Sequence, residues 1–294
     1  MDSFLEITEL FLKRRKVILS TTLLFFIIAV FYSLSLKNIY ESDGVYLIRN
    51  DSEQGQGNIV SLSALAGING QLGNNKSKII RSTLYSRDFF KYFYNDEALL
   101  AMITDIDEYQ KSSKDVSYNN FTLSSNEWKL IDGKSSKPSF EEAHDIFESS
   151  LSYENVDGPE IVRIKYNSRS PYVAKKILET IVKKINEDTR NFEKNDTDKS
   201  IEFLKEMLTN KNEVFLNNAY ANLLEQRVKS LELVEIYEDF SLKIIESPFV
   251  PEKKIKPKRT LIVVFFSAFG FILSLLLIAF NQFLINFRKR SLKN

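Results

Sequence analysis

Two long uncharged segments, one near each end of the chain, dominate the pattern of hydrophobic and polar positions. The first covers residues 17–36, VILSTTLLFFIIAVFYSLSL, and the second covers residues 260–286, TLIVVFFSAFGFILSLLLIAFNQFLIN. A helix of twenty residues is about 30 Å long, which matches the hydrocarbon thickness of a bilayer. The pattern therefore predicts two transmembrane helices, and the extra length of the second allows it to tilt.

The first segment has a second interpretation, a cleaved signal peptide. The basic residues 13–16, KRRK, precede it, and residues 33–35, SLS, loosely fit a cleavage site. Against cleavage, the apolar run is longer than the usual 7–15 residues of a signal-peptide core. We therefore predict an uncleaved anchor.

The basic residues beside the two spans predict their orientation. Four precede the first span, and four more lie in the tail, residues 287–294. Five basic residues within 253–259 argue the other way, but the first helix usually sets the topology and long domains translocate largely regardless of charge. We expect both termini to be cytoplasmic. Residues 1–16 predict either an amphipathic helix on the inner membrane surface or a simple extension of the first span.

Residues 37–195 predict a water-facing base domain of mixed helices and strands. Alternating positions indicate strands within Tyr40–Arg49 and over Glu160–Tyr166. Helices are predicted over residues 76–102 with a cap at Ser86, over 138–151 with a capping box, and over 172–191 after the cap and proline of the NSRSP turn. Between 103 and 135 the sequence is polar and irregular, with one short candidate strand at 121–123.

A glycine-rich stretch lies at residues 55–73. It lacks the GK[ST] ending of a phosphate loop, and its glycines do not follow the GxGxxG spacing. The stretch predicts a segment with one short helix, and a role in contacts with other protomers or a partner is a second interpretation.

Residues 196–242 contain neither proline nor glycine and carry a helical apolar stripe. A single helix of this length would reach roughly 70 Å, too long to bury its stripe in so small a domain. We predict a long projecting helix that packs against other protomers. Two ordinary helices with a kink near residues 217–221 are the alternative. The expected packing positions are Leu204, Leu208, Phe215, Leu224 and Leu231.

Residues 243–259 predict a return strand followed by a stiff, proline-rich strap into the second span. Proline fixes its own φ and forces the preceding residue into an extended conformation. The expected strap and anchor residues are Pro248, Pro251, Pro257, Lys258 and Arg259.

The composition argues against several classes of protein and of chemical site. The 40 basic and 39 acidic residues nearly cancel, which argues against a nucleic-acid-binding protein. The chain has no cysteine, so disulfides and thiolate chemistry are excluded. Its one histidine, His144, is interpreted as a surface residue on a helix rich in carboxylates. We therefore predict a protein that is not an enzyme, with no catalytic residue, no cofactor and no metal site.

Four segments together resemble the polysaccharide co-polymerases, the Wzz chain-length determinants. They are the basic KRRK before the first span, the small-residue stretch SLSALAGI, the unit IVRIKYNSRSPYVAKKILETIVKKI and the tail KIIESPFVPEKKIKPKRTLIVVFF. The spaced prolines that end in Pro-Lys-Arg before an apolar span are the most specific feature. The chain is short for the family, which predicts a reduced projecting part.

The resemblance implies an α+β membrane protein of the bacterial inner membrane, in which two transmembrane helices flank a periplasmic α/β base domain with a long projecting helix. It further implies a ring-like homo-oligomer in the lipid bilayer that acts with a membrane-embedded glycan polymerase on lipid-linked glycan. The leading hypothesis is a scaffold that sets the chain length of an O-antigen-like surface polysaccharide. An inner-membrane component of capsule or exopolysaccharide export, coupled to a transporter, is the alternative.

Overall fold

The computed structural model describes residues 14–49, 72–110, 115–209 and 214–291, so residues 1–13 and all but the last two residues of the glycine-rich stretch lie outside the described residues. The chain forms two compact units. The anchor unit comprises residues 1–39 and 254–294, and the central unit comprises residues 40–253. Mixed helices and strands between two apolar helices confirm the predicted fold class.

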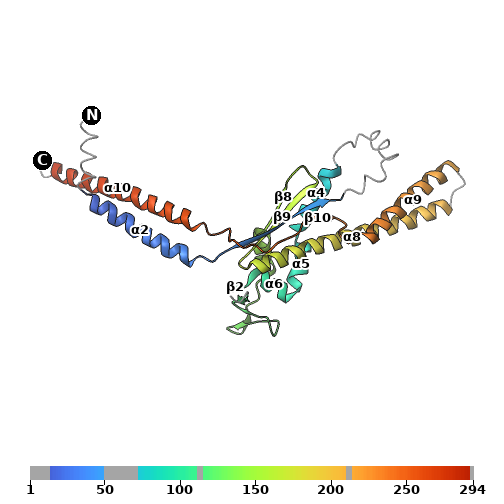
Figure 1. Cartoon of the computed structure of the whole chain (residues 1–294), viewed down its shortest axis with the longest axis horizontal. Coiled ribbons are helices and arrows are strands. Elements are labelled where there is room, and N and C mark those ends of the chain that lie inside the picture. Colours follow the sequence, from blue (N-terminus) through green and yellow to red (C-terminus); the bar gives the residue numbers. More distant parts are fainter. Residues whose placement is uncertain (1–13, 50–71, 111–114, 210–213, 292–294) are drawn as a thin grey trace, which may run out of the picture. The chain divides into compact units, whose positions relative to one another are not determined.

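The anchor unit consists of two helices, α2 (Arg15–Ser35) and α10 (Arg259–Ser291), that pack side by side (Figure 1). Both are long and apolar enough to cross a membrane. Only 11% and 17% of their most apolar windows are buried, so neither resembles the core helix of a soluble domain. Helix α10 continues to Ser291, beyond the predicted span of residues 260–286. The Arg and Lys residues that follow the span also have a high helix propensity, so the helix does not end with the apolar segment.

Small residues line the contact between these two helices. Ala29 and Ser33 on α2, and Gly270 and Ser274 on α10, are buried and lie four residues apart on each helix. A Cβ atom at Gly270 would lie 2.6 Å from the Cβ atom of Phe25. Small residues at this spacing let membrane helices approach closely, which strengthens their van der Waals contact.

The central unit is built on a four-stranded antiparallel sheet of order β10-β1-β9-β8. The strands are β1 (Tyr40–Ile48), β8 (Leu151–Asn155), β9 (Ile161–Ser168) and β10 (Leu242–Glu246). Alternate residues of β9, among them Val162 and Ile164, are buried, whereas Arg163 and Lys165 between them form ion pairs with Asp43 and Glu154. The predicted strands are confirmed, and the return strand pairs with the first strand of the unit.

Helices cover the buried face of the sheet. They are α4 (Leu72–Leu84), α5 (Arg87–Asn95), α6 (Glu97–Thr104), α7 (Phe140–Ser150) and α8 (Pro171–Thr209). The predicted caps at Ser86 and Ser139 are present, the latter as a full capping box with Glu142. The helix predicted over residues 76–102 is divided because Asp96 adopts an extended conformation and caps α6.

The interpretation of His144 as a surface residue is wrong. Its side chain is buried in the aromatic core, with ring centroids 5.4 Å from Phe90 and 6.2 Å from Phe140. Its neighbouring carboxylates on α7 suggested a polar face, but His144 lies one turn before the buried Phe147 and shares its inward side.

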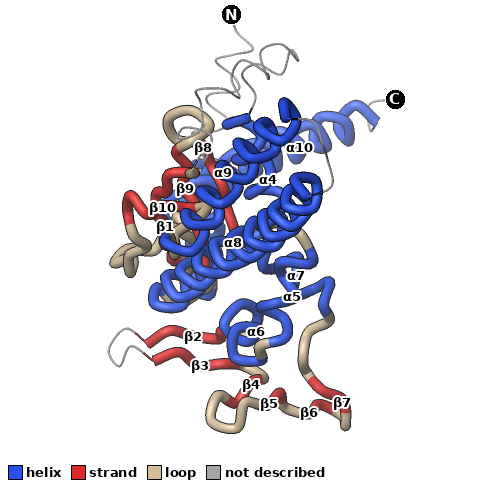
Figure 2. Tube along the Cα trace, turned by 90° about the vertical axis from the view of Figure 1, so that its right-hand side faces the viewer, coloured by secondary structure: helices blue, strands red, loops and turns tan. Residues whose placement is uncertain are grey.

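Three small antiparallel hairpins follow α6 and form the hairpin appendage, residues 106–135 (Figure 2). Their strands are β2 (Ile106–Gln110) with β3 (Asp115–Tyr118), β4 (Phe121–Thr122) with β5 (Glu127–Trp128), and β6 (Leu130–Ile131) with β7 (Lys134–Ser135). The sequence predicted only the strand at 121–123. Strands β5, β6 and β7 have two residues each, too few to show an alternating pattern.

Two helices replace the single long helix predicted over 196–242, as in the two-helix alternative, but they divide between residues 209 and 214 and not near residues 217–221. Helix α8 runs without a break from Pro171 to Thr209, and α9 (Val214–Ile236) lies beside it (Figure 1). An ion pair of 3.2 Å between Lys194 and Glu235 shows that the chain has turned back. Each of the two helices therefore covers part of the apolar stripe of the other.

Candidate functional site

The strap, residues 247–259, is held at both ends by side-chain hydrogen bonds. In the central unit, Pro248 and Pro251 are buried, and the Ser42 hydroxyl donates to the carbonyl of Phe249 at 2.7 Å. The proline positions are thus packed along the beginning of β1 rather than exposed as a free linker.

In the anchor unit, the strap pairs with the residues that follow α2. Ile39 and Lys256 form an isolated antiparallel bridge, in which the Ile39 N–H donates to the Lys256 carbonyl at 3.0 Å. The N–H groups of Ile255 and Lys256 donate to the Ile39 carbonyl at 2.9 and 3.4 Å. The Asn38 side-chain oxygen accepts hydrogen bonds from Lys254 at 2.9 Å and from Arg259 at 3.3 Å. Of the predicted anchor residues, Arg259 therefore joins the two chain segments, whereas Pro257 is half-buried and Lys258 is exposed.

Asn38 was not among the predicted site residues, because nothing near it in the sequence marks it as an acceptor for residues more than 200 positions away. The hydrogen-bonding capacity of the amide explains why an asparagine serves at this position. An amide oxygen has two lone pairs and can accept from both cations without adding a buried charge.

A second polar link fixes the return of the chain from α9 into β10. The side-chain oxygen of Asn186 on α8 accepts from the backbone N–H groups of Ser241 at 2.9 Å and Leu242 at 2.7 Å. Its amide nitrogen donates to the carbonyl of Leu242 at 3.2 Å. All of these contacts are buried, so one side chain satisfies three backbone groups at the start of the return strand.

The predicted packing residues lie on the α8–α9 hairpin in different environments. Leu204 is buried within its own chain, whereas Leu208, Leu224 and Leu231 are half-buried. The side chain of Phe215 lies outside the described residues. Large apolar side chains that the single chain leaves exposed on the same two helices are Phe192, Phe203, Leu223, Val228 and Ile236.

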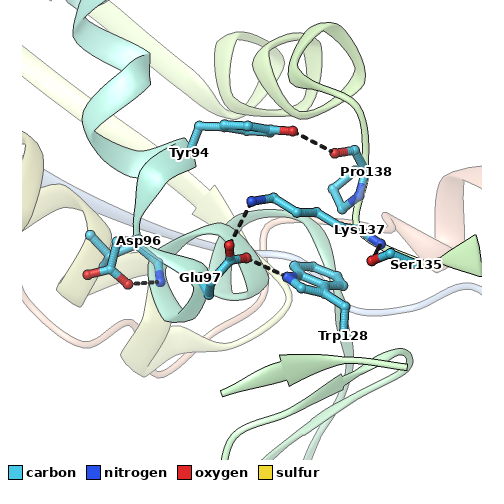
Figure 3. Close-up of polar contacts among 8 residues, drawn as sticks. Tyr94, Asp96, Glu97, Trp128, Ser135, Lys137 and Pro138 are labelled. Atoms are coloured by element: carbon cyan, nitrogen blue, oxygen red, sulfur yellow. Dashed lines mark hydrogen bonds and ion pairs between the residues drawn. The ribbon is translucent and has the colours of Figure 1, made fainter. Parts of the chain in front are cut away.

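Carboxylates hold the hairpin appendage on the helices. Glu97 accepts from the indole nitrogen of Trp128 and from the ammonium of Lys137, both at 2.7 Å (Figure 3). Partial burial pushes the pKa of Glu97 upward, but the hydrogen bonds from Lys137 and Trp128 and the charge of Lys137 outweigh it, so the pKa is lowered overall. The buried carboxylate of Asp105 accepts from the backbone N–H groups of Asn120 and Phe121 at 2.7 and 2.8 Å.

Within the described residues, no group of three or more His, Asp or Glu side chains is placed to hold a metal ion. The carboxylate oxygens of Glu97 and Asp105 accept hydrogen bonds from side chains and backbone N–H groups of the same chain. The polar side chains described above therefore connect and orient segments of the chain.

Comparison with known proteins gives a match over residues 3–97 to the Wzz family model, described as chain length determinant protein. The resemblance to the chain length determinants is confirmed. The matched region contains the first apolar helix, the first strand and the helices up to the beginning of α6. No match was found among curated proteins.

Two solved structures of co-polymerases are similar to this chain. One is a full-length bacterial polysaccharide co-polymerase, with 12% identity and a TM-score of 0.40 over 95% of this chain and 97% of that one. The other is a fragment of WzzB, a polysaccharide co-polymerase from Salmonella Typhimurium, with 14% identity and a TM-score of 0.28 over 74% of this chain and all of that one.

Proposed function

We propose that this protein is a non-catalytic scaffold of the bacterial inner membrane that regulates the chain length of an O-antigen-like surface polysaccharide. The match of residues 3–97 to the chain length determinants carries the proposal. Two exposed apolar helices, one near each end of the chain, support membrane anchoring. In this proposal both termini are cytoplasmic and the central unit is periplasmic.

The proposed assembly is a ring-like homo-oligomer that acts with a membrane-embedded glycan polymerase on lipid-linked glycan. The α8–α9 hairpin supports self-association because large apolar side chains, such as Phe203 and Val228, are exposed in the single chain. Packing between protomers would remove them from water, at about 25 cal/mol for each Å² of apolar surface. Leu208, Leu224 and Leu231 are half-buried and would be covered further in the same contact.

Deletion of the gene tests the function directly. The length distribution of the surface polysaccharide, resolved by gel electrophoresis, is expected to lose its preferred length while the polymer itself is still made. Re-expression of the full chain is expected to restore that length. An unchanged distribution in the deletion strain would reject the proposal, and loss of all surface polymer would instead favour a component of an export machine.

Leu208→Asp is expected to lower the mass of the detergent-solubilised oligomer, measured by light scattering. The new carboxylate would have to lose water when two hairpins pack together, and the cost of burying an unpaired charge opposes assembly. The matched control is Asn195→Asp, which adds the same charge at an exposed position of α8 and is expected to leave the mass unchanged. If Leu208→Asp retains the wild-type mass with unchanged helix content, this stripe is not the interface.

A further inference from the structure

A shallow depression of about 490 Å³ lies where α5 meets α6, beside the hairpin appendage. Its lining residues are Tyr92, Asn95, Asp96, Glu97 and Asn126. Residues 92–97 come from the helices, and Asn126 comes from the turn between β4 and β5. The site therefore exists only when the appendage is fixed in place.

Three of the side chains that line the depression suit the binding of a sugar. The ring of Tyr92 is 43% exposed, and the ammonium of Lys184 lies over one of its faces, 4.9 Å from the centroid. The opposite face is the flat surface that could take the C–H face of a pyranose. Within the described part of the chain, the amides of Asn95 and Asn126 have no hydrogen-bond partner, and each offers both donors and an acceptor. A sugar ring presents neighbouring hydroxyl groups that donate and accept at the same time, which an amide can match.

The fold holds these groups in place before any ligand arrives. Both oxygens of Glu97 are engaged by Trp128 and Lys137, which ties the appendage to α6 (Figure 3). Asp96 uses one carboxylate oxygen to cap α6. Asn126 has a φ of 56°, in the left-handed region where asparagine is tolerated better than most residues. Preorganisation of this kind lowers the entropy lost on binding.

A second depression of the central unit is lined by charged side chains at half of its positions. It has a volume of about 530 Å³ and runs between α8 and β10. Some of its polar side chains have partners, whereas the hydroxyl of Tyr46 is buried without one. Asn186 is fully used by backbone groups, Glu187 pairs with Lys183, and Asp239 pairs with Arg49. A ligand there would meet charged groups of both signs, whereas at the first depression an uncharged sugar would meet the amides of Asn95 and Asn126.

We propose that the depression between α5, α6 and the β4–β5 turn is a binding subsite for an uncharged sugar residue of the growing glycan. Tyr92 supplies the apolar surface, and Asn95 and Asn126 supply the hydrogen bonds. The carboxylate of Asp96, which also lines the depression, disfavours acidic sugars. This inference rests on the proposed function, because it identifies the glycan as the ligand of a scaffold that measures its length.

The test uses the full chain in lipid nanodiscs and oligosaccharides released by mild acid from the cell's own surface polysaccharide. Saturation-transfer-difference NMR is expected to detect binding to the wild type. Tyr92→Ala and Asn126→Gly are each expected to weaken it about tenfold, since each removes one specific contact. Tyr92→Phe keeps the ring and is expected to retain most of the affinity.

The matched control is Asp132→Gly. Asp132 is the other described non-glycine residue with a positive φ, at 50°, and it lies in the β6–β7 turn away from the depression. Glycine relieves the same backbone conformation at both positions, so only loss of the Asn126 side chain should affect binding. Absence of wild-type binding, or wild-type affinity in both Tyr92→Ala and Asn126→Gly, would overturn the subsite. If gene deletion still changes polymer length in that case, the proposed function stands without it.

Discussion

Replacing Asn186 with alanine is expected to lower the free energy of unfolding of the central unit by about 3 kcal/mol. The substitution leaves two buried N–H groups and one buried carbonyl at Ser241 and Leu242 without their present partner. Each unsatisfied buried group costs about 1–3 kcal/mol, and partial entry of water offsets some of that cost. The measurement is denaturant unfolding of the full chain in detergent, followed by the fluorescence of Trp128, the single tryptophan.

Asn191→Ala provides the control on the same helix. Asn191 is exposed, and its replacement is expected to change the free energy of unfolding by less than about 0.5 kcal/mol. Asn186→Asp keeps the acceptor but loses the donor to Leu242 and brings a charge into a buried site, so it should also destabilise. Equal stabilities of Asn186→Ala and Asn191→Ala would show that the link between α8 and the return strand contributes nothing.

The importance of Asn186 could not be predicted from the sequence, although much around it could. The strand over 160–166, the cap at Ser139 and the start of α8 after the NSRSP turn depend on neighbouring residues, and the structure confirms them. The contact of Asn186 with Ser241 joins residues 55 positions apart. Its place on α8, one residue after the apolar Ile185, gives no local signal that the amide faces the return strand.

The α8–α9 hairpin shows the same limit. The apolar stripe correctly predicted helix on both sides of residues 210–213, but helical periodicity is the same in one long helix and in two helices that pack against each other. The two arrangements differ only in what packs against the apolar stripe, and the periodicity does not contain that information. The candidate sugar subsite was missed for a related reason, because Tyr92 and Asn126 are brought together by Glu97 and Trp128, and no sequence spacing encodes that contact.

Gly270→Leu is expected to separate the two helices of the anchor unit. Even the first atom of a new side chain would lie 2.6 Å from the Cβ atom of Phe25, so α10 would have to move away from α2. Overpacking of this kind costs about 1–3 kcal/mol, which corresponds to a roughly five- to 150-fold loss of helix pairing. The aromatic contacts of Phe25 with Phe269 and of Tyr32 with Phe266 would be lost with it.

Cross-linking measures this separation well because the chain has no cysteine of its own. Cysteines placed at Tyr32 and Phe266, whose rings are 5.9 Å apart, are expected to join efficiently with a short bifunctional reagent in membranes and poorly after Gly270→Leu. The control is Ala268→Leu, which enlarges an exposed position of α10 and should leave the yield unchanged. If both variants cross-link like the parent, close packing at Gly270 does not hold the anchors together. If only Gly270→Leu fails and polysaccharide length also changes, the helix pair is part of the length-setting assembly and more than a passive anchor.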